Sequence, residues 1–157
     1  MTVPAGWTAD YVDMLRALVE AGVEFMLVGA HAMAVHGVPR ATLDLDVYVR
    51  ASAENAPRVI AALRAFGAPL SAHEVTQEDF EHSGTVYQLG LPPNRIDLIT
   101  RISGVEFEEA WASRVVTRIG ELEIPVIGRG PLLANKRAAG RDKDLVDVRL
   151  LERGPAR

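Results

Sequence analysis

Residues 25–49 read FMLVGAHAMAVHGVPRATLDLDVYV, and this stretch decides the fold. The apolar run 25–28 predicts a buried strand, Gly29 ends it, and residues 30–36 predict a short helix. From residue 42 to 49, polar and apolar residues alternate with period two, which predicts a strand with one polar and one apolar face. A strand, a glycine turn, a helix and a second strand in this order predict an α/β domain.

The remaining sequence continues the mixture of helices and strands. Helices are predicted over residues 8–21, 52–66, 106–112, 131–139 and 142–151, and strand pairs over 86–91 with 95–100 and 114–119 with 122–127. Pro125 predicts that the last of these strands lies at a sheet edge, because proline cannot donate a backbone hydrogen bond. No repeat and no linker interrupts the pattern, so we expect one domain over 1–157 with a core of about 10–151.

Composition excludes several classes of protein. Apolar residues make up 48% of the 157 residues and charged residues 24%, as in folded globular proteins. The absence of cysteine excludes disulfides, thiolate metal sites and cysteine nucleophiles. No apolar run is long enough to span a membrane, and residues 1–7 lack the features of a signal peptide, so we expect a cytoplasmic protein. The net charge of −4, with scattered basic residues, argues against duplex DNA but allows a polyphosphate carried with a metal ion.

Two carboxylates on the second predicted strand are the strongest chemical signal. Asp44 and Asp46 share one face about 7 Å apart, and they repel each other unless a positive charge lies between them. A divalent cation with oxygen ligands, such as Mg²⁺, would neutralise them. The alternative is a solvated sheet face that carries no ion.

Two further features favour the metal interpretation. Asp97 lies between apolar residues on the strand 95–99, and on a neighbouring strand it would bring a third carboxylate to a site suited to two metal ions. The alternative for Asp97 is an outward polar residue of an edge strand. Gly29 stands at a strand-to-helix turn, where free N–H groups favour a phosphate, although tight packing also explains a glycine there.

The ordered set of these features resembles a known family. The order of motifs resembles that of the polymerase-β-type nucleotidyltransferase superfamily. It consists of Val28-Gly29-Ala30, a spacing of thirteen residues, Asp44-Leu45-Asp46 and a later strand aspartate, Asp97. The strings VGAHAMAVHGVPRATLDLDVYV and LLANKRAAGRDKDLVDVRLL resemble its small bacterial members, the minimal nucleotidyltransferases and the toxin-type nucleotidyltransferases of abortive-infection systems. The resemblance covers residues 10–151. It implies a twisted mixed sheet of five or six strands with helices mainly on one face.

The resemblance also implies roles for individual residues. Asp44 and Asp46 would hold Mg²⁺ or Mn²⁺ with the triphosphate, and Asp97 would complete the metal site and help to deprotonate an acceptor hydroxyl. The implied nucleotide- and phosphate-binding residues are Gly29, Ala30, Arg40, Thr42, Lys136, Arg141 and Asp144. Ala30 departs from the family, which usually has serine there, so a hydroxyl directed at the phosphate is missing.

The C-terminal basic segment has its own alternatives. Both lysines of the chain, Lys136 and Lys143, lie in it, and a lysine offers a compact charge to a phosphate. The alternative is a solvated helix with Arg141–Asp144 and Lys143–Asp147 ion pairs. Asp147 is predicted to be a structural partner of a basic residue.

Two functional hypotheses follow. The first is metal-dependent transfer of a nucleoside monophosphate from an NTP, such as ATP, to a hydroxyl or phosphate acceptor on tRNA, another RNA, a protein or a small molecule. Its narrower branch is a toxin–antitoxin or phage-defence system with a cognate partner protein. The second is a catalytically degenerate module that binds a nucleotide or a partner in the same cleft. Neither duplex DNA nor a membrane is an expected partner.

Overall fold

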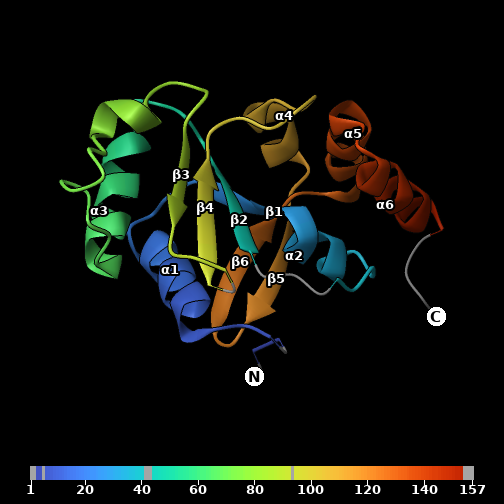
Figure 1. Ribbon diagram of the computed structural model, residues 1–157, viewed down its shortest axis with the longest axis horizontal. Helices are drawn as coiled ribbons and strands as arrows, with labels where there is room; N and C mark the ends of the chain where they lie inside the picture. The colour runs from blue at the N-terminus through green and yellow to red at the C-terminus, as the bar shows by residue number, and fades with distance from the viewer. Residues whose placement is uncertain (1–2, 5, 41–43, 93, 154–157) are drawn as a thin grey trace.

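A computed structural model describes residues 3–4, 6–40, 44–92 and 94–153 of the chain. Its centre is a six-stranded mixed sheet with the strand order β3-β4-β2-β1-β6-β5 (Figure 1). The strands are β1 (Phe25–Val28), β2 (Asp44–Val49), β3 (Val86–Leu89), β4 (Arg95–Ile99), β5 (Val115–Ile119) and β6 (Leu122–Val126). The helices are α1 (Ala9–Glu20), α2 (Gly29–Val35), α3 (Ala56–Phe66), the 3₁₀ helix η1 (Gln77–Phe80), α4 (Phe107–Ala112), α5 (Arg129–Ala139) and α6 (Asp142–Glu152).

The strand pairing confirms the predicted mixed sheet. β1 pairs with β2 in antiparallel and with β6 in parallel orientation, and β2 pairs with β4 in parallel orientation. The two predicted hairpins are β3–β4 and β5–β6. The strand that carries two aspartates and the strand that carries the third are therefore direct neighbours inside the sheet, which excludes an edge position for Asp97.

Pro125 does not mark a sheet edge, so that prediction was wrong. β6 lies between β1 and β5, and β5 is the edge strand. Ile127 donates its N–H to Leu27 of β1, and residues two apart in a strand direct their N–H groups to the same side, so the missing donor of Pro125 faces β1. The β1–β6 ladder consists of the single register pair Leu27↔Val126, and the proline therefore costs this ladder little.

The helices cover the sheet in two groups. α1 and α3 pack side by side, and α5 and α6 form a second pair at the other side of the molecule (Figure 1). Strand β1 is buried along its whole length, as its unbroken apolar sequence predicts. The predicted polar loop 68–83 is anchored by η1, whose Phe80 is fully buried in the core. None of the helices in the described part of the chain combines the length and the apolar character that crossing a bilayer requires.

The polar face of β2 is open at one end and covered at the other. At the covered end, Tyr48 packs edge-on against Phe107 of α4, with ring centroids 5.0 Å apart, and donates a hydrogen bond to the carbonyl of Val105. Towards the other end of β2, the same face carries Asp44 and Asp46, which are both partly exposed. The helix packing thus leaves the two carboxylates as the accessible part of this face.

Candidate active site

Three carboxylates from two adjacent strands meet beside the first turn of α2. In the parallel register Asp46 stands opposite Asp97 and Asp44 opposite Arg95. The carboxyls of Asp46 and Asp97 share a hydrogen bond, and the Arg95 guanidinium lies 2.8 Å from Asp44 Oδ2 and 3.1 Å from Asp97 Oδ1. The structure therefore brings the three predicted metal ligands together, with a cation of the chain itself among them.

Burial and mutual repulsion raise the pKa of Asp46. Desolvation is the largest cause, followed by the negative charges of Asp97 and Asp44, and together they raise the pKa of Asp46 to about 6. Arg95 lowers it, but by less than the other causes raise it. The cluster consequently holds more negative charge than its own arginine neutralises, which is the electrostatic condition for binding a further cation.

The backbone at position 29 comes so close to the carboxylate cluster that only glycine fits there. The φ of Gly29 is +68°, and a Cβ at this position would lie 2.4 Å from Asp46 Oδ2. Glycine alone fits, because any side chain would be strained by the backbone and would also collide with the carboxylate. The turn between β1 and α2 thus places bare backbone directly against Asp46.

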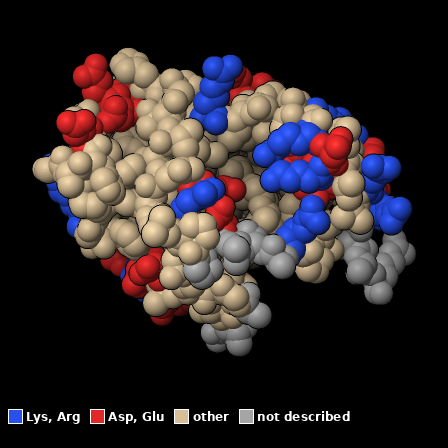
Figure 2. Space-filling model, viewed as in Figure 1, with Lys and Arg blue, Asp and Glu red and all other residues tan. Residues whose placement is uncertain are grey.

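A pocket of about 620 Å³ joins the carboxylates to the C-terminal helices. Predicted site residues on its wall are Gly29, Ala30, Arg40, Asp44, Asp46, Lys136, Arg141 and Asp144. Asp97 does not line it and contacts it through Asp46, and Thr42 lies outside the described residues. Figure 2 shows Lys and Arg gathered over α5 and α6, a mixed acidic and basic group near the centre, and a hollow between them.

A larger groove of about 730 Å³ lies elsewhere, bordered by α3 and residues 68–77. Its only charged lining residue is Arg64, and it contains no carboxylate. The smaller pocket remains the candidate site, because the predicted carboxylates Asp44 and Asp46 line it.

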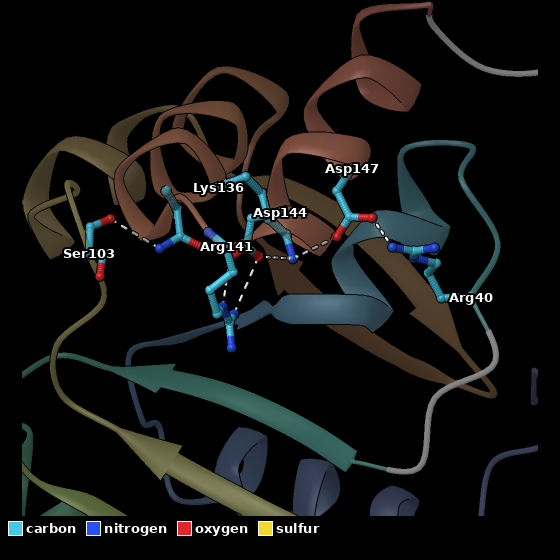
Figure 3. Close-up of polar contacts among 7 residues, drawn as sticks. Arg40, Ser103, Lys136, Arg141, Asp144 and Asp147 are labelled. Carbon is cyan, nitrogen blue, oxygen red and sulfur yellow. Dashed lines mark hydrogen bonds and ion pairs between the residues drawn. The ribbon is translucent and has the colours of Figure 1, made fainter.

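An ion network on one wall of the pocket connects α5, α6 and the segment after α2 (Figure 3). Lys136 Nζ lies 3.0 Å from Asp147 Oδ2 and 3.5 Å from Asp144 Oδ1. Arg40 forms an ion pair with Asp147, and Arg141 Nε lies 2.6 Å from Asp144 Oδ2. Three cations and two carboxylates thus alternate along the wall, and Lys136 links α5 to Asp144 and Asp147 of α6.

The network settles which of the predicted ion pairs form. The Arg141–Asp144 pair is present, and Asp144 Oδ2 also accepts the backbone N–H of Arg141 at the start of α6. Asp147 is the structural partner of basic residues, as predicted, but its partners are Arg40 and Lys136 rather than Lys143. Gly140, in a left-handed conformation, ends α5 and separates it from α6.

Known proteins share this architecture. A lincosamide antibiotic adenylyltransferase, LnuA, solved with lincomycin bound, superimposes with a TM-score of 0.54 at 13% sequence identity, covering 97% of this chain and 98% of that one. A nucleotidyltransferase-like antigenic protein of Paracoccidioides brasiliensis gives a TM-score of 0.50 at 17% identity, over 91% of this chain and 73% of that one. The chain has the nucleotidyltransferase fold.

This nucleotidyltransferase fold confirms the fold expected from the sequence resemblance. The likeness is one of fold, because the sequence identities are low. No family model matches the chain, and no curated protein matches it by sequence.

Sequence reasoning missed three polar residues of the pocket wall, Arg101, Ser103 and Asn135, and it singled out Lys143 without assigning it a role. Arg101 and Lys143 are exposed, and neither makes an ion pair with any residue that the structure describes. One signal could have found Arg101, which follows the strand of Asp97 by two residues.

The carboxylates of the candidate site suit a hard divalent cation. Asp44, Asp46 and Asp97 offer only carboxylate oxygens, which Mg²⁺ and Mn²⁺ prefer. Among the residues described, however, no group of three or more His, Cys, Asp and Glu side chains already encloses a space for an ion. The carboxylate oxygens are therefore of the type that binds a metal ion. In this structure, however, Asp44 and Asp97 form ion pairs with Arg95.

The raised pKa of Asp46 predicts a pH dependence of stability without metal. The pKa of an unfolded aspartate is 3.8, so between that value and about 6 the folded protein binds more protons, and its stability falls as the pH rises. We expect Asp46→Asn to melt above wild type in EDTA by a margin that grows by a few degrees from pH 5 to pH 8. Differential scanning fluorimetry measures it, and a constant margin contradicts the assignment.

Proposed function

We propose that this chain is a divalent-cation-dependent nucleotidyltransferase that moves a nucleoside monophosphate from an NTP to an acceptor hydroxyl or phosphate. One observation carries the proposal: three carboxylates of adjacent strands converge beside the bare backbone of Gly29, at the end of a pocket whose opposite wall is basic. A triphosphate is anionic and is carried with cations. Its binding therefore requires carboxylates on one side of the pocket for the cations and basic side chains on the other side for the phosphates.

The residues divide into those that would hold metal and those that would hold phosphate. Asp44, Asp46 and Asp97 would coordinate the ion, which when bound would neutralise charge on the phosphates. Gly29 and Ala30 would border the triphosphate with backbone, since Gly29 admits no side chain and Ala30 has no hydroxyl. Thr42 keeps its predicted place on the phosphate side as a hypothesis.

The basic wall contributes in two ways. Arg101 and Lys143 are exposed and have no competing ion pair within the described chain, so we propose that they contact the phosphates directly. The same pocket is also lined by Arg40, Lys136 and Arg141. Ion pairs with Asp144 and Asp147 neutralise part of their positive charge. The side chain of Asp144 is fully buried, so its proposed role is to hold Lys136 and Arg141 in place.

In the reaction, an oxygen of the acceptor attacks the α-phosphorus, the bond to the bridging α–β oxygen breaks, and pyrophosphate leaves. For a hydroxyl acceptor the proton would pass to a carboxylate, and our candidate for this role is Asp97, which interacts with Asp46. The lincosamide adenylyltransferase was solved with a small molecule bound, which makes a small-molecule hydroxyl one acceptor to test, beside RNA and protein. A toxin–antitoxin role and a cognate partner stay predictions.

Nucleotide binding tests the proposal before the acceptor is known. We expect at least one NTP to raise the melting temperature of the full chain in the presence of Mg²⁺, by several degrees near 100 times its Kd. Asp46→Asn should abolish the Mg²⁺-dependent part, whereas the exposed Asp13→Asn should retain it.

Two other results would redirect the assignment. No shift with any nucleotide would contradict it. Tight nucleotide binding without any product on RNA, protein or small-molecule acceptors would favour the degenerate binding module instead.

A further inference from the structure

Arg95 occupies the middle of the carboxylate cluster. It is the first residue of β4 and stands opposite Asp44 in the parallel register. Its Nη2 lies 2.8 Å from Asp44 Oδ2, while Nε and Nη2 donate to Asp97 at 3.1 and 3.3 Å. One guanidinium therefore holds two of the three carboxylates, in the forked geometry that suits arginine better than lysine.

This position conflicts with a bound metal ion. A carboxylate oxygen that accepts a hydrogen bond from the guanidinium cannot also give that lone pair to a cation, and the positive charge of Arg95 repels a divalent ion at the same place. The conflict explains why the three aspartates converge without enclosing a space for an ion among the described residues. Arg95 and a divalent cation therefore compete for the same carboxylate oxygens.

We propose that Arg95 sets the divalent-cation affinity of this site, by serving as its counter-ion in the metal-free protein and leaving Asp44 and Asp97 when a metal ion enters. The inference rests on the proposed function, since it requires that the cluster bind a divalent ion. The side chain of Arg95 is 31% exposed, so it reaches solvent without passing through the core. Its departure also frees Asp97, whose carboxylate is otherwise held by Arg95 and Asp46.

The test measures metal binding rather than activity. Mn²⁺ is titrated into the metal-free full chain, with free Mn²⁺ followed by electron paramagnetic resonance. We expect Arg95→Met, which keeps the apolar stem and removes the charge, to bind Mn²⁺ about tenfold more tightly than wild type or better. Arg95→Lys keeps the charge but cannot span both carboxylates, so its affinity should fall between the two.

A matched control removes one positive charge elsewhere. Arg118 lies on edge strand β5 and pairs with Glu123 at 3.3 Å, and it does not line the pocket. Arg118→Met changes the net charge by the same amount as Arg95→Met, so it reports how much of any gain is a long-range effect. We expect wild-type Mn²⁺ affinity in this control.

Stability gives a second readout. We expect Arg95→Met to melt several degrees below wild type in EDTA, because three carboxylates then lack their counter-ion, and to approach wild type at saturating Mn²⁺. A loss of the same size in both conditions would mean that Arg95 keeps its contacts in the metal-bound protein, and would overturn the inference. If Arg95→Met does not fold, the ranking of Arg95→Lys against wild type decides.

The remaining outcomes separate this inference from the proposed function. Unchanged or weaker Mn²⁺ binding in both Arg95 variants, with wild type still binding, overturns the role of Arg95 and leaves metal-dependent transfer standing. An equal gain in Arg118→Met also overturns it. Failure of wild type and all variants to bind Mn²⁺ removes the metal site, and both proposals fall together.

Discussion

Replacing Asp46 with asparagine is expected to lower nucleotidyl transfer by about three orders of magnitude or more. Asp46 contacts Asp97, touches the space beside Gly29 and lines the pocket, so it stands at the centre of the proposed metal site. Asparagine keeps the shape of the side chain but removes the negative charge that would bind the cation. The metal-free fold should remain intact, because the substitution also removes a buried like-charge repulsion.

The measurement uses an α-³²P-labelled NTP with Mg²⁺ and follows transfer of label into RNA, protein and small-molecule fractions. Asp13→Asn is the control, since Asp13 is exposed on α1 and does not line the pocket. Label transfer by Asp46→Asn at the wild-type rate would refute the assignment of this residue. Transfer by wild type but by neither variant would point to a general effect of the lost charge.

The second large effect concerns stability. Asp144→Ala is expected to lower the free energy of unfolding by about 3 kcal/mol, near the lower end for breaking a buried ion pair. The carboxylate of Asp144 is fully buried, accepts from the backbone N–H and side chain of Arg141, and lies 3.5 Å from Lys136. Its removal also leaves the backbone N–H of Arg141, at the start of α6, without its acceptor. Asp147 still neutralises Lys136, which keeps the loss from being larger.

Thermal and urea unfolding measure this loss, and the melting temperature should fall by roughly 10 °C. Asp142→Ala is the matched control, because Asp142 is an exposed aspartate in the same first turn of α6, and it has no ion pair with the residues described. A loss of equal size in both variants would show that the effect comes from the helix N-terminus in general. A negligible loss in Asp144→Ala would show that the network does not stabilise the wall.

The fold could be predicted from the sequence because its signals are local. The apolar run of β1, the turn at Gly29 and the alternation of β2 each follow from residues that are neighbours in the chain. Pro125 was misjudged because the length of the β1–β6 ladder depends on how distant strands end. The expectation that a strand with proline lies at a sheet edge considers that strand alone. It does not tell how many residues of the neighbouring strand are paired with it.

The candidate site could be predicted only as far as residue types allow. The three aspartates and Gly29 were predicted from their order along the chain, because each of them alone has an ordinary alternative. The place of Arg95 between Asp44 and Asp97 follows from strand register, and the pairing of Asp147 with Arg40 depends on the angle between helices. Spacing within one helix offered the Arg141–Asp144 pair as an alternative, but it could not show that Lys136 contacts Asp144 and Asp147.

The Arg40–Asp147 ion pair joins residues that are 107 positions apart in the chain. Contacts of such separation form late, because a long loop must close before they are gained. On a translating ribosome, Gly29 and the three aspartates are made well before Asp147. The part of the basic wall on α5 and α6 cannot assemble until α6 has left the exit tunnel, so a nascent chain carries its acidic cluster with an incomplete basic wall.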